Sequence, residues 1–225
     1  VKQMSFNIAI DGPAGAGKST IAKKFAEQLH FIYVDTGAMY RGMAYYFLEN
    51  KIDLLNEELV CSFCPKINIS IAYQDGLQHV LCNQIDVTAS IRSDEIGNGA
   101  SIISAYGCVR SHLLALQKKL AKEHDVIMDG RDIGSFVLPD ADLKLYLTAS
   151  VDCRAKRRFE EFLAKQEPAN YEEIKQKIID RDHRDMTREV APLMQAADAI
   201  LIDSSNLTID EVLMKLNCLY KEVAK

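Results

Sequence analysis

The sequence predicts an α/β fold in which a five-stranded parallel sheet is flanked by helices and carries a small antiparallel β insert. Three observations lead to this prediction. Short runs of apolar and β-branched residues alternate with longer segments whose apolar residues recur every three or four positions. Between residues 66 and 87 this pattern gives way to three short strands joined by tight turns. From residue 151 to residue 189 the helical pattern becomes polar and rich in arginine.

The five apolar runs read as buried parallel strands, because a strand–helix–strand order implies right-handed crossovers. They lie at residues 6–10, 31–34, 126–128, 143–147 and 199–202. The first intervening helix places Ile21, Phe25 and Leu29 on one stripe, as expected for a helix that packs on a sheet. Further helices are expected at residues 40–48, 93–104, 109–120, 151–165, 171–189 and 208–223.

The antiparallel insert is predicted from alternation. Ile67, Ile69 and Ile71 point to one side of an expected strand, and the turn sequence Gln74-Asp75-Gly76 follows it. Residues 77–81 and 85–87 supply the second and third strands.

Composition excludes several classes of protein. The chain has 225 residues, 48% of them hydrophobic and 26% charged, which excludes a disordered tail, a collagen-like repeat and a disulfide mini-scaffold. With 27 Lys and Arg against 32 Asp and Glu, the net charge of −5 argues against a nucleic-acid-binding surface. No apolar run reaches the roughly 18 residues of a membrane span.

The first six residues are too short and too polar for a signal peptide, so we expect a cytoplasmic protein. Either an initiator residue preceded Val1, or Met4 is the true start and residues 1–3 are not native. In the cytoplasm the scattered cysteines are expected to be reduced thiols. Cys61 and Cys64 have the spacing of half a zinc site, but with no second close pair we interpret them as small apolar residues on a helix. The cysteines are Cys61, Cys64, Cys82, Cys108, Cys153 and Cys218.

Residues 12–19 match G-x-x-x-x-G-K-[ST], between an expected buried strand and an expected amphipathic helix. Glycines let such a loop wrap around phosphates with its backbone N–H groups pointing inward. We expect Lys18 to reach the β- and γ-phosphates of a nucleoside triphosphate and Ser19 to offer its hydroxyl to Mg²⁺. The fold is therefore predicted to be of the P-loop NTPase type. The predicted ATP-binding residues are Gly12, Pro13, Ala14, Gly15, Ala16, Gly17, Lys18, Ser19 and Thr20.

Two fragments are similar to GTPase motifs, Asn50-Lys51-Ile52-Asp53 (N-K-x-D) and Asp94-Glu95-Ile96-Gly97 (D-x-x-G). Their order along the chain is the reverse of that in GTPases, and the first lies at a predicted helix end instead of a strand end. We interpret both as accidental.

Charged loops follow two other predicted strands, at residues 35–41 and 129–132. Because α/β proteins bind ligands at the carboxyl ends of their strands, these loops predict a second anion site beside the P-loop. Arginines then recur at helical spacing on two further faces, where like charges repel unless an anion lies between them. These faces carry Arg154, Arg157 and Arg158, and then Arg181, Arg184, Asp185 and Arg188. A solvated surface with Arg181 paired to Asp185 is the alternative, but beside a P-loop the pattern favours a small-molecule kinase, whose transition state spreads charge over phosphoryl oxygens.

Four segments together resemble the bacterial cytidylate kinases, of the nucleoside monophosphate kinase group. They read I-D-G-P-A-G-A-G-K-S-T at 10–20, D-T-G-A-M-Y-R at 35–41, D-G-R-D-I-G at 129–134, and R-D-x-R-D-x-x-R at 181–188 followed by A-P-L at 191–193. The resemblance covers essentially the whole chain. It implies transfer of the γ-phosphoryl group of Mg·ATP to CMP or dCMP. Because a phosphate oxygen of the acceptor is already nucleophilic, no general base is expected. By default we expect a monomer.

The resemblance also implies a division of the chain. The core is expected at about residues 1–35, 105–150 and 190–225, and the monophosphate-binding region at about 36–104, with the antiparallel insert at about 62–90. A helical lid is expected at about 151–189.

Site roles are carried over from the family onto matching residues. Contacts with the base or its neighbourhood fall to Thr36, Ser101, Arg110 and Asp132. The monophosphate site would be lined by Asp35, Tyr40, Arg41, Asp129 and Arg131. The ribose would be bound by Arg181 and Asp185, and the phosphates by Arg188. The residues expected to stabilise the charge on the transferred phosphoryl group are Lys18, Arg131, Arg188 and the lid residues Arg157, Arg158 and Arg184. Structural roles are the alternatives for three of these: Ser101 bonding a helix carbonyl, Tyr40 packing, and Arg110 lying solvated on its helix.

Two stretches depart from the family pattern. Tyr106-Gly107-Cys108 replaces a proline that commonly opens the helix bearing Arg110, so we expect a looser helix start. Residues 166–170 form an unusual lid tip. The alternative functions are a P-loop kinase with another acceptor (UMP, AMP or a shikimate-like molecule) and, less favoured, a nucleotide-binding switch.

Overall fold

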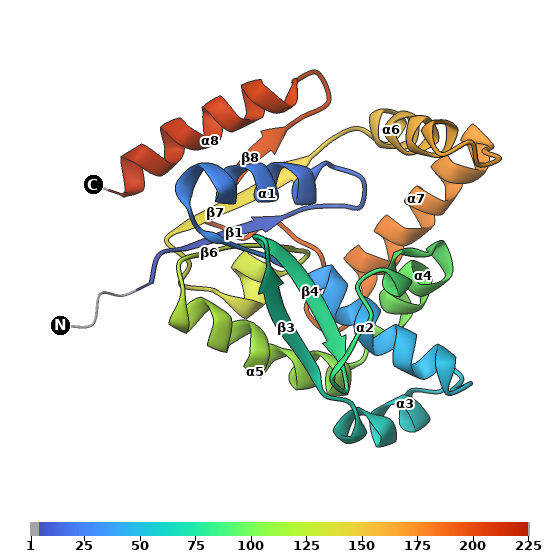
Figure 1. Cartoon of the computed structure of the whole chain (residues 1–225). Helices are drawn as coiled ribbons and strands as arrows, with labels where there is room; N and C mark the ends of the chain where they lie inside the picture. Colours follow the sequence, from blue (N-terminus) through green and yellow to red (C-terminus); the bar gives the residue numbers. More distant parts are fainter. Residues whose placement is uncertain (1–4, 225) are drawn as a thin grey trace.

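A five-stranded parallel sheet forms the centre of the computed structural model, which describes residues 5–224 (Figure 1). The strand order is β2-β6-β1-β7-β8, and every neighbouring pair is parallel. The strands are β1 (Asn7–Asp11), β2 (Ile32–Asp35), β6 (Val126–Gly130), β7 (Leu143–Thr148) and β8 (Ile200–Asp203). The predicted α/β class and its five parallel strands are confirmed. The question of whether residues 1–3 are native lies outside the described residues.

Helices cover both faces of this sheet, which is why its strands are almost continuously apolar. On one face α1 (Lys18–Leu29) and α8 (Ile209–Val223) pack against Ile8 and Ile10 of β1. On the other face α2 (Thr36–Glu49) and α5 (Gly107–Glu123) pack in the cluster that contains Ala9. The carboxyl ends of the strands are left free at one edge, where the loops of the site lie.

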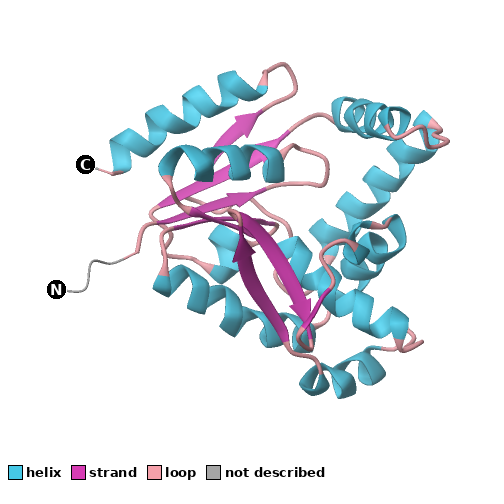
Figure 2. Cartoon of the chain, viewed as in Figure 1, coloured by secondary structure: helices cyan, strands magenta, loops and turns pink. Residues whose placement is uncertain are grey.

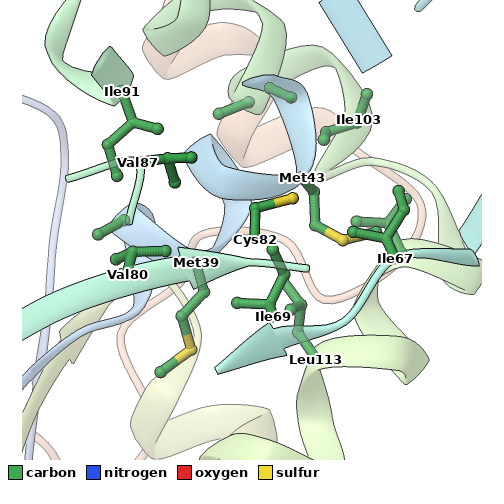
Figure 3. Close-up of a cluster of buried hydrophobic side chains, with 14 of the residues drawn as sticks. Met39, Met43, Ile67, Ile69, Val80, Cys82, Val87, Ile91, Ile103 and Leu113 are labelled. Atoms are coloured by element: carbon green, nitrogen blue, oxygen red, sulfur yellow. The ribbon is translucent and has the colours of Figure 1, made fainter. Parts of the chain in front are cut away.

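The insert is the predicted antiparallel meander, with strands β3 (Ile69–Gln74), β4 (Leu77–Cys82) and β5 (Ile85–Asp86). It packs on α2, where Figure 3 shows Met39 and Met43 among Ile69, Val80 and Cys82. Gly42 of α2 permits this close approach, because a Cβ there would lie 3.0 Å from the Cγ1 of Val80. Short helical segments precede and follow it: α3 (Glu57–Phe63), η1 (Cys64–Lys66), η2 (Ser90–Arg92) and α4 (Asp94–Ile103).

The arginine-rich segment forms two helices, α6 (Val151–Ala164) and α7 (Tyr171–Thr187), which extend away from the sheet in Figure 2. They pack on each other through a small apolar cluster of their own, with Ala155, Ile174 and Ile178. The predicted limits of core, monophosphate-binding region and lid stay predictions. None of the helices within residues 5–224 is long and apolar enough to cross a membrane.

The expectation of six reduced cysteines is wrong for one pair. Cys61 of α3 and Cys108 in the first turn of α5 form a disulfide, because the two short segments lie side by side with a Cα–Cα distance of 5.6 Å. Cys64 is free and buried, as the apolar interpretation predicts. At the start of α5 the N-cap residue Tyr106 makes no side-chain capping bond. Its hydroxyl donates to the carbonyl of Leu54 at 2.8 Å, and the disulfide joins Cys108 to α3. The expected looser helix start stays a prediction.

Candidate active site

The loop between β1 and α1 has the backbone of a phosphate cradle. Gly12 has φ 146°, and a Cβ there would lie 1.9 Å from the carbonyl oxygen of Leu147, so no other residue fits. Gly17 adopts a left-handed conformation directly before α1 and directs the chain into the helix. The free N–H groups at this helix start make the loop an anion site.

Lys18 begins α1 and is buried, with its Nζ donating to the carbonyl of Pro13 at 2.8 Å. Burial, and then repulsion by the nearby Arg131, lower the pKa of Lys18 to about 7. An anion bound in the loop would favour the protonated amine.

Asp129, at the carboxyl end of β6, accepts hydrogen bonds on both carboxylate oxygens. Ser19 Oγ donates to Oδ2 at 3.0 Å, and the Tyr33 hydroxyl donates to Oδ1 at 2.9 Å. The Thr36 hydroxyl donates to the Asp129 backbone carbonyl at 2.8 Å. Burial, with the nearby Asp35, raises the pKa of Asp129 to about 6. The Ser19 hydroxyl and the Asp129 carboxylate are hard oxygen donors of the kind that Mg²⁺ prefers.

A second polar group surrounds Asp132, whose carboxylate forms a buried ion pair with Arg110 and lies 3.5 Å from Nη2 of Arg188. Ser104 joins the same two arginines, accepting from Arg110 Nη1 on its carbonyl at 3.1 Å and from Arg188 Nη1 on its hydroxyl at 3.3 Å. Arg110 is 3% exposed, which excludes a solvated helix residue. The hydroxyl of Ser101, also buried, has no hydrogen-bond partner among residues 5–224 and so bonds no helix carbonyl there.

Tyr40 and Phe136 both face Arg110, with their ring centroids 5.8 and 5.6 Å from its Cζ. Burial raises the pKa of Tyr40 to about 12. Tyr40 also packs against the apolar cluster of α2. Arg110 Nε is buried here and has no hydrogen-bond partner in the part of the chain that the structure describes.

The third, cationic group contains Arg131, Arg181 and Arg41 with the acidic partners Asp185 and Asp35. It carries more positive than negative charge and connects the loop after β6 to α7. Arg131 pairs with Asp185 of α7, with Nε 3.0 Å from Oδ2, so the alternative of a simple Arg181–Asp185 pair is wrong. Burial alone would raise the pKa of Asp185, but Arg131 and Arg181 outweigh it and hold that pKa below its usual range. Burial, and then repulsion by Arg131, lower the pKa of Arg181 to about 10, and its Nε has no partner. At the edge of this group Arg41 pairs with Asp35, the N-cap of α2, at 2.8 Å.

The P-loop, the Asp132 group and the cationic group line one open cavity of about 1700 Å³. Both arginine-rich helices and the tip of the insert, at Leu77 and Gln78, border it as well. This volume is well above the roughly 300–1,000 Å³ of a pocket for one small ligand.

Comparison with known proteins identifies the family. Residues 8–222 match the model of the family described as Cytidylate kinase. The cytidylate kinase of Shouchella clausii is 46% identical over 217 residues, which cover 96% of each chain. That of Desulfitobacterium hafniense is 47% identical over 218 residues, covering 97% of this chain and 94% of the relative. The chain belongs to the cytidylate kinase family.

The family assignment confirms the predicted resemblance and the predicted enzyme class, a kinase. It replaces the GTPase and nucleotide-switch hypotheses. Among solved structures, an uncharacterized protein from Eubacterium ventriosum aligns with a TM-score of 0.55 over 96% of this chain and 99% of its own, at 12% identity. That likeness concerns the fold alone.

Three arginines that are expected to bind phosphates from the lid of a cytidylate kinase bond other residues of the chain in this structure. Arg157 donates to the carbonyl of Ser204 at 2.8 Å. Arg158 pairs with Asp94 at 2.6 Å and with Glu161 at 2.8 Å. Arg184 donates to the Asn98 side chain at 3.2 Å. Arg157 nevertheless lies beside the P-loop, because a Cβ at Gly17 would be 3.9 Å from its Nη1. All three side chains border the cavity that the P-loop lines.

Sequence reasoning placed Arg154 on the arginine face without giving it a role. Its Nη1 donates to the P-loop carbonyl of Ala14 at 3.0 Å, and its Nη2 pairs with Asp182 of α7 at 2.7 Å. It therefore connects both α6 and α7 to the phosphate loop. Tyr33 and Ser104 were also missed. The one signal for Tyr33 was its place near the end of a strand that leads into the site.

Proposed function

We propose that the chain transfers the γ-phosphoryl group of Mg·ATP to CMP or dCMP, giving ADP and CDP or dCDP. The observation that carries this proposal is the buried Arg110–Asp132 pair, which faces the same cavity as the P-loop. Beside it, Ser101 Oγ and Arg110 Nε are buried without partners. Buried polar atoms without partners are costly, so their presence in a cavity favours a ligand that bonds them.

On the donor side, the backbone of residues 12–17 and Lys18 would hold the phosphates of ATP. Ser19 and Asp129 would hold Mg²⁺, which neutralises phosphate charge when bound. Thr20, which follows Ser19 on α1, also borders the cavity.

On the acceptor side, a cytosine edge presents an amino group to donate and a ring nitrogen and carbonyl to accept. Asp132 would accept from the amino group, Arg110 and Ser101 would bond the other atoms, and Thr36 and Tyr40 would border the ring. Arg41 and Arg131 would bind the acceptor phosphate, in a part of the site that Asp35 and Asp129 also line. Arg181 and Asp185 would bind the ribose, and Arg188 the phosphates.

In the reaction an oxygen of the acceptor phosphate attacks the γ-phosphorus of ATP, and the bond from that phosphorus to the β,γ-bridging oxygen breaks. The electron pair of that bond stays on ADP. Because the attacking phosphate oxygen is already ionised, no general base is required. Lys18, Arg131 and Arg188 would stabilise the charge that spreads over the γ-phosphoryl oxygens.

Water would compete as acceptor, so a lid that closes over both substrates is required. In the proposed closed state Arg157, Arg158 and Arg184 exchange their present partners for phosphate oxygens. We further propose that the enzyme works in the cytoplasm as a monomer and binds neither nucleic acid nor membrane, in keeping with its net charge of −5.

The test is ADP formation from Mg·ATP with CMP, dCMP, UMP, AMP, GMP, dTMP, shikimate or no acceptor. Strong stimulation by CMP and dCMP over the others is the expected result. If another acceptor stimulates ADP formation more strongly, the proposed phosphoryl transfer is kept and the roles given to Ser101, Arg110 and Asp132 are wrong. Slow ADP formation that is equal with every acceptor would overturn the proposal as a whole.

A further inference from the structure

Asp11, the last residue of β1, is a buried carboxylate that the proposed reaction does not use. It is 4% exposed and lies directly before Gly12 of the phosphate loop. Its Oδ1 accepts the backbone N–H of Ile133 at 2.8 Å, and its Oδ2 accepts that of Gly134 at 2.7 Å. One side chain of β1 thus bonds the segment that follows β6.

Ile133 and Gly134 are the first residues of the short helical segment η3 (Ile133–Val137). The first N–H groups of a helical segment have no partner within it, and an aspartate directly before the segment normally caps them with its own side chain. Asp132 occupies that position, yet its side chain makes no capping hydrogen bond. The capping is done by Asp11, from another strand.

The consequence is that both oxygens of Asp132 face the arginines. One lies in the ion pair with Arg110, and the other is 3.5 Å from Nη2 of Arg188. If Asp132 turned to cap its own segment, the buried Arg110 would lose its carboxylate partner.

Burying the Asp11 carboxylate lowers the free energy of unfolding. Burial raises the pKa of Asp11 to about 7, because an ionised carboxylate is disfavoured away from water. An apolar residue would avoid that cost but would leave two buried N–H groups without partners. A carboxylate is the smallest group that accepts from both.

We infer that Asp11 is a positioning residue for the acceptor base: by capping Ile133 and Gly134, it leaves the Asp132 carboxylate free to hold Arg110 and Arg188. The inference rests on the proposed function, in which this group reads the cytosine edge. Asp11 touches neither substrate and acts through Asp132.

Asp11→Asn tests this role. The amide keeps one acceptor oxygen but turns its NH₂ toward the second backbone N–H, so one capping bond is lost. We expect the KM for CMP to rise about tenfold, and the preference for CMP over UMP to fall by a similar factor. The KM for ATP should stay within about twofold of wild type, because both side-chain hydrogen bonds of Asp11 go to η3 and none to the phosphate loop. The comparison uses KM values and not kcat, because the charge of Asp11 also favours the protonated form of Lys18.

A double-mutant cycle separates positioning from general stabilisation. In the Asp132→Asn background, Asp11→Asn should add almost nothing to the KM for CMP, because its effect passes through Asp132. Asp142→Asn is the matched control: Asp142 Oδ2 also accepts a backbone N–H of β1, that of Asn7 at 2.7 Å, but at the opposite end of the strand. It should leave both KM values unchanged.

Three results would overturn the inference: an unchanged KM for CMP in folded Asp11→Asn, an equal rise for CMP and ATP, or additive effects in the cycle. Should Asp11→Asn fail to give a cooperative thermal transition, Asp11→Ser, which keeps one acceptor, is measured in its place. Failure of both to fold also overturns the inference, because the carboxylate would then serve the fold itself. Wild-type enzyme that CMP does not stimulate refutes the proposed function, an outcome separate from these.

Discussion

Ser19 and Asp129 are joined by a hydrogen bond, with the Ser19 hydroxyl donating to Oδ2 of Asp129 at 3.0 Å. The bond links the first turn of the P-loop helix to the end of β6, and it places a hydroxyl and a carboxylate where the proposed Mg²⁺ would bind. Without a cation, a fully buried carboxylate in this position is unfavourable, which is why burial raises the pKa of Asp129 to about 6.

Asp129→Asn should therefore abolish most of the turnover and stabilise the protein. We expect the free energy of unfolding at pH 7 to rise by about 1 kcal/mol in the absence of nucleotide, because the variant avoids burying a charge. In wild type, the free-energy cost of burying the ionised Asp129 carboxylate is fully present above pH 6. It shrinks as pH falls from about 6 toward 3.8, because Asp129 then takes up a proton in the folded state. Urea unfolding of both proteins between pH 5 and pH 8 measures this difference.

The expected gap between variant and wild type is thus larger at pH 7 than at pH 5. Thr187→Val, which removes an exposed hydroxyl bonded within α7, serves as a control that should give no pH-dependent difference. A variant that is less stable than wild type at pH 7 would contradict the argument.

Lys18→Ala should lower kcat by about 10²–10³-fold while leaving the fold intact. Within residues 5–224 the amine bonds only the carbonyl of Pro13, and burial lowers its pKa to about 7, so its removal costs the protein little. Circular dichroism and thermal unfolding check the fold, and ATP binding is measured separately by calorimetry. Near-normal turnover with intact ATP binding would exclude the proposed role.

The Cys61–Cys108 disulfide closes a segment 47 residues long that contains the whole antiparallel insert. By the chain-entropy account, its reduction should lower the free energy of unfolding by about 4 kcal/mol. Cys61→Ser should behave like the reduced protein, whereas Cys218→Ser, which changes an exposed free thiol, should not.

Thiol titration in denaturant decides whether this bond exists in solution. Four of the six cysteines should react before reduction and all six afterwards. If six react without reductant, the bond is absent under those conditions.

The parts of the site that could be predicted from sequence are those with local signals. The P-loop is contiguous, and the loops at 35–41 and 129–132 follow strands whose ends meet at one edge of a parallel sheet. The disulfide was missed because nothing in the sequence brings α3 against α5. The partners of Arg154 and Asp11 were missed for the same reason: each bonds backbone groups of a distant segment, and a backbone carbonyl or N–H leaves no mark in a sequence.

Ser101 offers a prediction in which stability and binding move in opposite directions. Its hydroxyl is buried and has no hydrogen-bond partner in the described part of the chain. Ser101→Ala should therefore leave the free energy of unfolding unchanged or raise it slightly. If the hydroxyl bonds the acceptor base, the same variant should raise the KM for CMP about five- to tenfold, because a hydrogen bond to a ligand contributes roughly 1 kcal/mol.

Ser104→Ala is the matched comparison, since the Ser104 hydroxyl donates to the Ser101 carbonyl at 2.9 Å and accepts from Arg188. Its loss leaves a buried arginine N–H without a partner, so this variant should be destabilised by about 1 kcal/mol. Urea unfolding and steady-state kinetics with varied CMP measure both effects for both variants. A clear loss of stability in Ser101→Ala, with no change in the KM for CMP, would assign Ser101 to the fold and remove it from the acceptor site.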